Sequence, residues 1–334
     1  MSVFVSGATG FIAQHVVKEL VKQGYEVVGS VRSEAKGEHL SKLINSYKFS
    51  YVVVPDIVAK GAFDHVLQDN ENIESFIHTA SPVDFGVSNI QTGLLDPAIE
   101  GTKNVLSAIK NYGKNVKNVV VTSSVAAVDD ASGKRPSNSL STESSWNEIS
   151  LQQGLQNTSL GYKAAKTFAE KEVWRFAEEN KGQFNVTTVN PTYVFGPQAF
   201  KVQNKNQLND SAEYVNKIIK LKPEDSIPFF ASSFIDVRDV AKAHVAAIKR
   251  PKEFNGQRLL LIDSPWTNEL LAVIINEHFP NLDIPKGSKE KSDKELATAD
   301  LKWDNSKTKS LLDFGFIPLE KSVVDAVQQL LEVE

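Results

Sequence analysis

Short apolar runs alternate with stretches of helical periodicity over the first part of the chain. Six runs rich in Val and Ile have the length of strands and cover residues 3–7, 25–32, 49–57, 73–81, 116–124 and 184–191. Helix-period stretches lie between them, at about 11–23, 34–45, 60–69, 94–112 and 162–180. Such apolar strands, separated by helices, are typical of βαβ units in which helices cover both faces of a parallel sheet. The pattern predicts an α/β fold with a doubly wound parallel sheet.

The periodicity changes after about residue 195. The rest of the chain is a smaller, mixed region, with helical tracts near 267–279, 306–313 and 319–332. We therefore expect a first domain over 1–195 and a smaller lobe over 196–334, with part of 235–263 returning to the first domain. Residues 129–160 are polar and rich in turn-forming residues, which predicts a long surface loop.

Composition excludes several classes of function. The chain has 334 residues, is 41% hydrophobic, and carries a net charge of −4, so nucleic acid and anionic membranes are not expected partners. Cysteine is absent, which excludes disulfides, a thiol nucleophile and thiolate-bound zinc. The histidines lack metal-ligand spacing, so no metal site is expected. The N-terminus has neither a basic signal-peptide segment nor a membrane-spanning apolar run, which predicts a cytoplasmic protein.

A glycine-rich turn follows the first strand and opens the first helix, in the sequence "GATGFIA" from Gly7 to Ala13. Gly7 permits a tight turn, Gly10 lets the backbone approach a pyrophosphate, and Ala13 leaves room for the helix to pack on the strand. The exposed N–H groups and the helix dipole favour an anion there. The turn predicts dinucleotide binding by the residues Gly7, Ala8, Thr9, Gly10, Phe11 and Ile12.

The end of the second strand indicates which dinucleotide binds. An NAD site usually places an acid about 20 residues past the glycines, whereas NADP needs cations for its 2′-phosphate. The stretch "GSVRSEAKGE" places Arg32 and Lys36 there, although Glu34 and Glu38 leave open a solvated helix start of mixed charge. A guanidinium binds phosphate in a bidentate manner and an ammonium adds a point charge. NADPH is therefore the favoured cofactor.

A tyrosine and a lysine lie four residues apart in "GYKAAKTFAEKEVW", which begins at Gly161. On a helix, this spacing puts Tyr162 and Lys166 on one face. A phenol near pKa ~10 is a poor acid or base at neutral pH, and a neighbouring cation lowers that value. The fifth strand ends in the hydroxyls of Thr122, Ser123 and Ser124, at the edge where ligands of open α/β sheets bind. A serine could donate a hydrogen bond to a carbonyl oxygen and Tyr162, with its pKa lowered by Lys166, could protonate that oxygen while nicotinamide supplies hydride.

These motifs resemble the extended short-chain dehydrogenases/reductases, of the dihydroflavonol-4-reductase-like branch. The resemblance rests on Gly7-x-x-Gly10-x-x-Ala13, the serine after the fifth strand, and Tyr162-x-x-x-Lys166, and it extends through "HTASPVDF", "NPTYVFGPQ" and "FIDVRDVAKAH" over essentially the whole chain. It implies a Rossmann-type domain that binds NADPH and a smaller C-terminal substrate lobe. Val125 lies at a position where yeast relatives often carry an aromatic residue. Of the properties that the resemblance implies, substrate preference is therefore the one it supports least.

The resemblance also implies residue roles. Ser124 corresponds to the carbonyl-binding serine, with Ser123 as the alternative. Tyr162 and Lys166 complete the catalytic set and also contact the cofactor. The remaining implied cofactor contacts are Asp56 and Ile57 beside the adenine, Thr79, Ala80 and Ser81 along the cofactor, Pro191, Val194 at the nicotinamide end, and Ser211. Phe85 and Tyr193 would border the substrate.

The favoured function is an NADPH-dependent reductase of aldehydes and ketones, acting as a monomer or homodimer, and the resemblance implies substrates like methylglyoxal or isovaleraldehyde. A nucleotide-sugar epimerase or dehydratase shares the glycine turn and the Tyr/Lys pair, but it retains NAD and has no use for Arg32 and Lys36 as phosphate ligands. A non-enzymatic NADP sensor would have no reason to keep the Ser/Tyr/Lys set. Both remain as alternatives.

Overall fold

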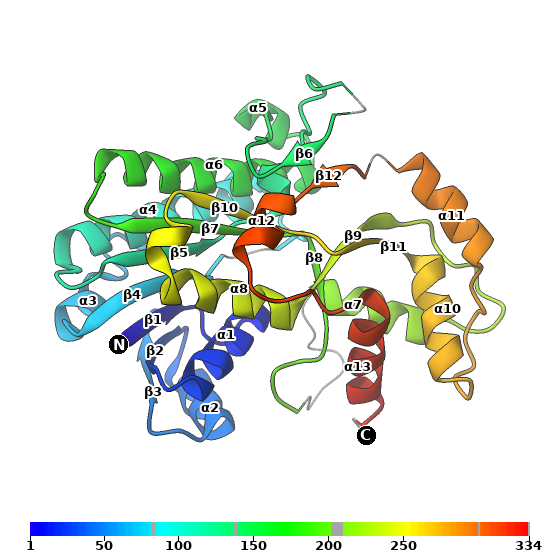
Figure 1. Ribbon diagram of the computed structural model, residues 1–334, viewed down its shortest axis with the longest axis horizontal. Helices are drawn as coiled ribbons and strands as arrows, with labels where there is room; N and C mark the ends of the chain where they lie inside the picture. Colours follow the sequence, from blue (N-terminus) through cyan, green and yellow to red (C-terminus); the bar gives the residue numbers. More distant parts are fainter. Residues whose placement is uncertain (82–83, 137–138, 202–209, 300, 333–334) are drawn as a thin grey trace.

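Seven parallel strands form the central sheet of the computed structural model, which describes residues 1–81, 84–136, 139–201, 210–299 and 301–332 (Figure 1). The strand order is β10-β7-β5-β4-β1-β2-β3. The bounds are β1 Ser2–Ser6, β2 Glu26–Val31, β3 Phe49–Val53, β4 Ile73–His78, β5 Asn118–Thr122, β7 Asn185–Pro191 and β10 Gln257–Leu261. The chain crosses from one side of β1 to the other after β3, which makes β1 and β4 the topological switch point. The predicted doubly wound α/β fold is confirmed.

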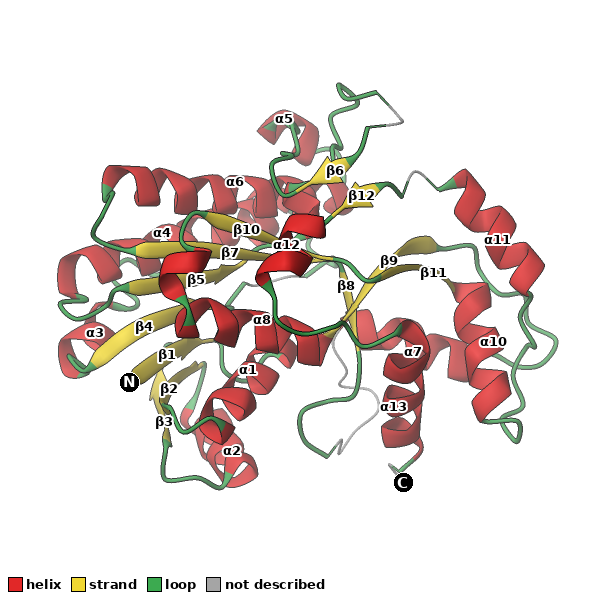
Figure 2. Cartoon of the chain, in the orientation of Figure 1, coloured by secondary structure: helices red, strands yellow, loops and turns green. Residues whose placement is uncertain are grey.

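Helices cover both faces of this sheet, as Figure 2 shows. One layer contains α1 (Phe11–Lys22), α2 (Glu34–Ile44) and α8 (Val237–Lys249), and the other contains α3 (Asp64–Asp69), α4 (Asp96–Tyr112) and α6 (Thr158–Glu179). A single π-helical turn, η1 (Gln91–Leu95), precedes α4. Because both faces are covered, β1 is buried at all five positions, which explains why the strands read as continuous apolar runs.

A second, smaller sheet has the order β11-β9-β8, from β8 (Tyr193–Phe195), β9 (Ala231–Asp236) and β11 (Ser264–Thr267). It packs with helices that lie at one end of the molecule (Figure 1). These are α7 (Asp210–Ile219), α10 (Asn268–His278), α11 (Lys289–Thr298) and α13 (Leu319–Leu331). The sequence pattern had not predicted α7 or α11; α11 is mostly charged, and its apolar periodicity is correspondingly weak.

Residues 129–160 are not the simple loop that their polarity predicts. They contain a short strand, β6 (Ser141–Thr142), a short helix, α5 (Leu151–Gly154), and the first residues of α6. β6 pairs in parallel with β12 (Trp303–Asp304), a contact between segments far apart in sequence. Such pairing has no local signal, because the partner strand comes from the other end of the chain.

The segment 235–263 contributes to both sheets. Its β9 residues belong to the small sheet, whereas α8 packs against α1 and β10 pairs with β7 in the central sheet. Two short helices, α9 (Pro251–Phe254) and α12 (Ser306–Leu311), complete the chain together with a 3-10 turn, η2 (Val125–Ala127). The division into domains 1–195 and 196–334 stays a prediction. Within the described residues, no helix is both long and apolar enough to cross a membrane.

Candidate active site

The glycine turn lies between β1 and α1, at the switch point of the sheet. Gly7 has a φ of +66°, and a Cβ there would lie 3.0 Å from the Ala80 Cα, so this turn requires glycine. The Gly7 N–H donates to Ser30 Oγ at 2.9 Å, which ties the turn to β2. Helix α1 starts after Gly10 with no side-chain cap and no acidic residue in its first turn. Uncapped N–H groups and the absence of a carboxylate suit a bound phosphate anion.

The predicted 2′-phosphate ligands flank the start of α2, next to the end of β2. Arg32 and Lys36 are both exposed, and within the described residues neither forms an ion pair. Glu34 instead accepts a hydrogen bond from the Tyr51 hydroxyl at 2.8 Å, and this contact raises the pKa of Tyr51. The acid closest to Arg32 in sequence is therefore held against β3, and two cations remain available to an anionic group.

The residues predicted along the cofactor follow β3 and β4. Asp56 is exposed and its carboxylate accepts the Val58 N–H at 2.9 Å, while Ile57 is half-buried. The Thr79 and Ala80 N–H groups both donate to Ser6 Oγ at 3.0 Å, which holds this segment against the end of β1. Ser81 is half-buried. These positions lie at the carboxyl ends of strands adjacent to the glycine turn, so one extended ligand could reach all of them.

Tyr162 and Ser124 come together where β5 ends. The Tyr162 hydroxyl lies 3.4 Å from Ser124 Oγ, although the residues come from α6 and from the turn after β5. Ser124 Oγ also accepts the Ala126 N–H at 3.1 Å and lies 3.5 Å from the Pro191 carbonyl, to which it can donate. The two hydroxyls converge on a point where one carbonyl oxygen could accept from both.

Lys166 lies one helical turn after Tyr162 on α6. Its Nζ lies 5.8 Å from the centre of the Tyr162 ring, and the residue is only 9% exposed. Burial lowers the pKa of Lys166 to about 8, an effect that Glu170 partly opposes. A buried lysine of this kind is cationic at neutral pH but close to titration, which suits a group that modulates a neighbouring phenol.

The two serines have different environments, which separates the alternatives left open by the sequence. Ser123 Oγ donates to the Glu170 carboxylate in the interior, whereas Ser124 Oγ faces Tyr162. Thr122, at the end of β5, bonds to His244 Nε2 at 2.7 Å. Among these three strand-end hydroxyls, only that of Ser124 reaches Tyr162.

Aromatic side chains border the hydroxyl pair. The Phe85 ring lies 5.6 Å from the Tyr162 ring, centre to centre, and the residue is 46% exposed. Tyr193 packs edge-on against Tyr214 and Trp266, and burial raises its pKa. Pro191 and Val194, from the same segment, are buried. The predicted cofactor contact Ser211 lies outside the residues whose side chains the structure describes.

Two buried charges beside the site, Glu170 and Arg258, were not among the predicted site residues. Glu170, one helical turn after Lys166, binds Arg258 of β10, with 2.6 Å between Oε1 and Nε. The side chains are 0% and 8% exposed, respectively. A signal was present in each case: an acid on the lysine face of the helix, and an arginine at the start of the apolar strand "QRLLLID".

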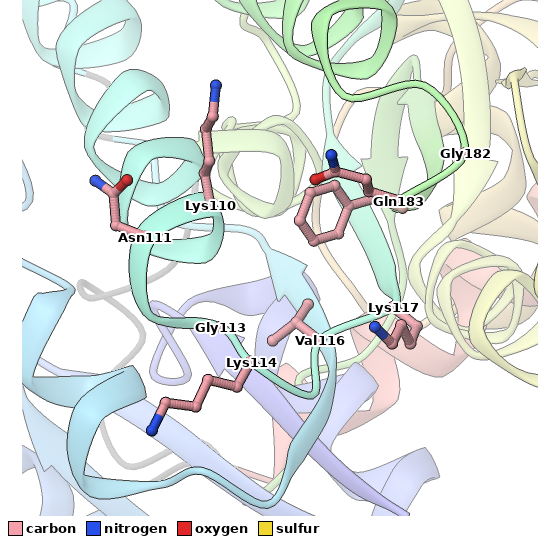
Figure 3. A pocket seen from close by; sticks show the side chains of 9 residues that line it. Lys110, Asn111, Gly113, Lys114, Val116, Lys117, Gly182 and Gln183 are labelled. Atoms are coloured by element: carbon pink, nitrogen blue, oxygen red, sulfur yellow. The ribbon is translucent and has the colours of Figure 1, made fainter.

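A surface hollow of about 580 Å³ lies away from this site. Figure 3 shows it between the end of α4 and the turns before β5 and β7, lined by Lys110, Lys114 and Phe184 among others. It therefore lies at the amino ends of the strands, opposite Ser124. A second cavity of only about 20 Å³ lies next to the candidate site, lined by Lys166, Glu170 and His78 among others. Among the described residues, no group of three His, Cys, Asp or Glu could hold a metal ion.

Comparison with known proteins gives a consistent assignment. Residues 3–262 match the NAD dependent epimerase/dehydratase family. The chain is 44% identical to the NADPH-dependent methylglyoxal reductase of Saccharomyces cerevisiae over 100% of this chain and 99% of the relative. It resembles the structure of Gre2 from Candida albicans in complex with NADPH, with a TM-score of 0.95 and 46% identity over 100% and 99% of the two chains. The yeast methylglyoxal/isovaleraldehyde reductase Gre2, also complexed with NADPH, gives a TM-score of 0.94 at 43% identity over 99% and 98%. The chain thus belongs to the NAD dependent epimerase/dehydratase family, whose members are extended short-chain dehydrogenases/reductases.

Proposed function

We propose that this protein is an NADPH-dependent carbonyl reductase that converts small aldehydes and ketones into alcohols. The observation that carries the proposal is the convergence of the Tyr162 and Ser124 hydroxyls, 3.4 Å apart, beside a buried Lys166. Relatives of more than 40% identity whose names specify methylglyoxal or isovaleraldehyde reduction support these two aldehydes as the first substrates to test.

The proton chemistry belongs to the three side chains. When bound, NADPH supplies hydride to the carbonyl carbon. Ser124 donates a hydrogen bond to the carbonyl oxygen and orients it toward Tyr162. As negative charge develops on that oxygen, the Tyr162 phenol transfers its proton and completes the alcohol. The Lys166 ammonium stabilises the phenolate that remains, because an opposite charge nearby favours the ionised form.

The cofactor assignment depends on the glycine turn and on two cations. The uncapped start of α1 would hold the pyrophosphate, and Arg32 and Lys36 would bind the 2′-phosphate. Asp56 and Ile57 would border the adenine, and Thr79, Ala80 and Ser81 would line the path to Pro191 and Val194 at the nicotinamide end. Phe85 and Tyr193 would enclose the substrate.

The proposal is tested by mixing purified protein with NADPH and either methylglyoxal or isovaleraldehyde, and following reduced-nicotinamide absorbance. Steady loss of absorbance, with one alcohol formed per NADPH consumed, is expected. An epimerase or dehydratase would instead release bound NAD on denaturation and leave NADPH unchanged over a broad panel of carbonyls. A sensor would bind NADPH without turnover, so either of these outcomes would overturn the proposal.

A further inference from the structure

Glu170 is buried at the centre of a polar network behind the candidate active site. Its residue exposure is 1%, and five side chains donate hydrogen bonds to its carboxylate. These donors are Ser123, Trp174, Thr188, Asn190 and Arg258. A carboxylate with this many donors in the interior is stabilised in its charged form.

The network connects the segments that carry the proposed catalytic groups. Asn190 donates both to Glu170, at 2.6 Å, and to the Ser124 main-chain carbonyl, at 3.2 Å. The Arg258 guanidinium also donates hydrogen bonds to the main-chain carbonyls of Ala127, at 3.3 Å, and Glu143, at 3.0 Å. It thereby connects β10 to the turn after Ser124 and to the segment before α5. Glu170 is therefore attached to the backbone on which Ser124 lies.

Glu170 also interacts electrostatically with Lys166. The residues are four apart on α6, hence on one face of the helix, and both line the cavity of about 20 Å³. The other ionisable groups that face Lys166 are Tyr162 on α6 and His78 on β4. His78 is neutral at physiological pH, because burial lowers its pKa to about 3. Glu170 is consequently the anion that opposes the cost of burying the Lys166 ammonium.

We infer that Glu170 is a positioning residue for the proposed reduction: its buried carboxylate keeps Lys166 cationic and so sets the alkaline limit of activity. The inference rests on the proposed function only where it concerns catalysis. Removing a nearby negative charge destabilises the Lys166 ammonium, so its proton leaves at lower pH. Glu170 contributes a charge in addition to its hydrogen bonds and packing, so substitutions that keep or remove the charge distinguish these contributions to the Lys166 titration.

The test is the titration of Lys166 in the full chain without cofactor. Lysine labelled with carbon-13 at Cε reports amine protonation by its chemical shift, and Lys166→Met assigns the signal. Glu170→Gln should lower the midpoint of Lys166 by about one pH unit, as expected for loss of one charge at this range in a protein interior. An unchanged midpoint in a folded Glu170→Gln protein would show that Glu170 is only structural.

Three further variants separate charge from structure. Glu170→Asp keeps the charge and should restore the parent midpoint, and Trp174→Phe removes one hydrogen bond to Glu170 and should leave it unchanged. If Glu170→Gln does not fold, because Arg258 is left buried without its partner, the double change Glu170→Gln and Arg258→Met removes both charges. The midpoint of Lys166 should still fall in this double variant, but by less than one charge alone would give, because the repulsion from Arg258 is lost as well. A shift of equal size in Trp174→Phe would contradict the inference.

Turnover supplies the second readout. With methylglyoxal and saturating NADPH, the alkaline limb of kcat should move to lower pH in Glu170→Gln by an amount similar to the shift of Lys166. If the protein reduces no carbonyl at all, the proposed function fails, whereas the Lys166 titration still decides the role of Glu170. If turnover is present and its alkaline limb stays in place although Lys166 shifts, Glu170 does not set the alkaline limit.

Discussion

The hydroxyl groups of Tyr162 and Ser124 lie 3.4 Å apart although 38 positions of sequence separate them. Helix α6 supplies the tyrosine and the turn after β5 supplies the serine, so the relationship depends on how α6 packs across the sheet. Lys166 and Glu170 follow Tyr162 on the same helix at successive intervals of four residues. The proposed proton donor, the lysine cation and the buried anion thus share one helical face that ends in the interior.

Tyr162 and Lys166 should respond differently to substitution. Tyr162→Phe removes only the hydroxyl, so fold and NADPH affinity should survive while hydride transfer slows by ~10²–10⁴, as is typical for loss of acid catalysis. Lys166→Ala should lower the rate and also weaken NADPH binding. The measurements are single-turnover hydride transfer at saturating NADPH, and cofactor affinity by fluorescence. A folded Tyr162→Phe protein that works at the parent rate would contradict the mechanism.

Arg32 and Lys36 should determine cofactor preference. Changing both to Ala should raise the KM for NADPH far more than that for NADH, because only NADPH loses charge-assisted contacts to a 2′-phosphate. Lys42→Ala, an exposed charge in the last turn of the same helix, is the matched control and should alter neither constant. Equal effects of the double change on the two cofactors would refute the assignment.

Phe85 should influence substrate choice. Its ring lies 5.6 Å from that of Tyr162 and is partly exposed, so Phe85→Ala should widen the entrance and change the relative kcat/KM of small and bulky aldehydes. NADPH affinity should remain near the parent value. Tyr47→Ala, which alters a ring that is 94% exposed, provides the comparison. An unchanged substrate ranking would leave Phe85 with no role in recognition.

Arg258 should contribute strongly to stability. Arg258→Met leaves the Glu170 carboxylate buried without its cation, and breaking such a pair typically costs ~3–5 kcal/mol of unfolding free energy. It also removes the contact of the guanidinium with the Trp146 ring, 4.0 Å from its centre. Arg175→Met breaks ion pairs of a 59% exposed arginine and should cost about 1 kcal/mol or less. Denaturant unfolding of both proteins measures the difference; equal losses would contradict the prediction.

Stability should fall as the pH is lowered, partly because of His244. Its Nδ1 faces the Val240 carbonyl at 2.8 Å and its Nε2 faces Thr122 Oγ1, an arrangement that suits the neutral ring. Burial lowers its pKa from 6.5 to about 4, so between these values the unfolded chain binds a proton that the folded chain does not. A shift of this size corresponds to roughly 3 kcal/mol.

The check on His244 is the dependence of unfolding free energy on pH. The loss of stability between pH 6.5 and 4 should be smaller in His244→Gln than in the parent. His65→Gln changes an exposed histidine and should leave the slope as it is. A parent-like slope in His244→Gln would mean that this ring contributes no proton linkage.

Local spacing made much of this site predictable. The glycine turn is readable because only particular residues fit a tight turn between a strand and a helix, and the geometry of a helix places residues 162 and 166 on one face. The strands were recognisable because burial on both faces demands continuous apolar runs. Fold class and the candidate tyrosine, lysine and strand-end serines follow from such short-range rules.

Long-range packing accounts for the rest. The orientation of Ser123 and Ser124 depends on Glu170 on one side and Tyr162 on the other, and no local pattern distinguishes the two hydroxyls. Glu170 and Arg258 are 88 positions apart, and they meet only because β10 returns to the central sheet beside β7. Side-chain pairing across a sheet depends on strand order, which is set by the burial of the whole core. The helix spacing could have indicated an acid next to Lys166, but its burial and its pairing with Arg258 were decided by the folded structure.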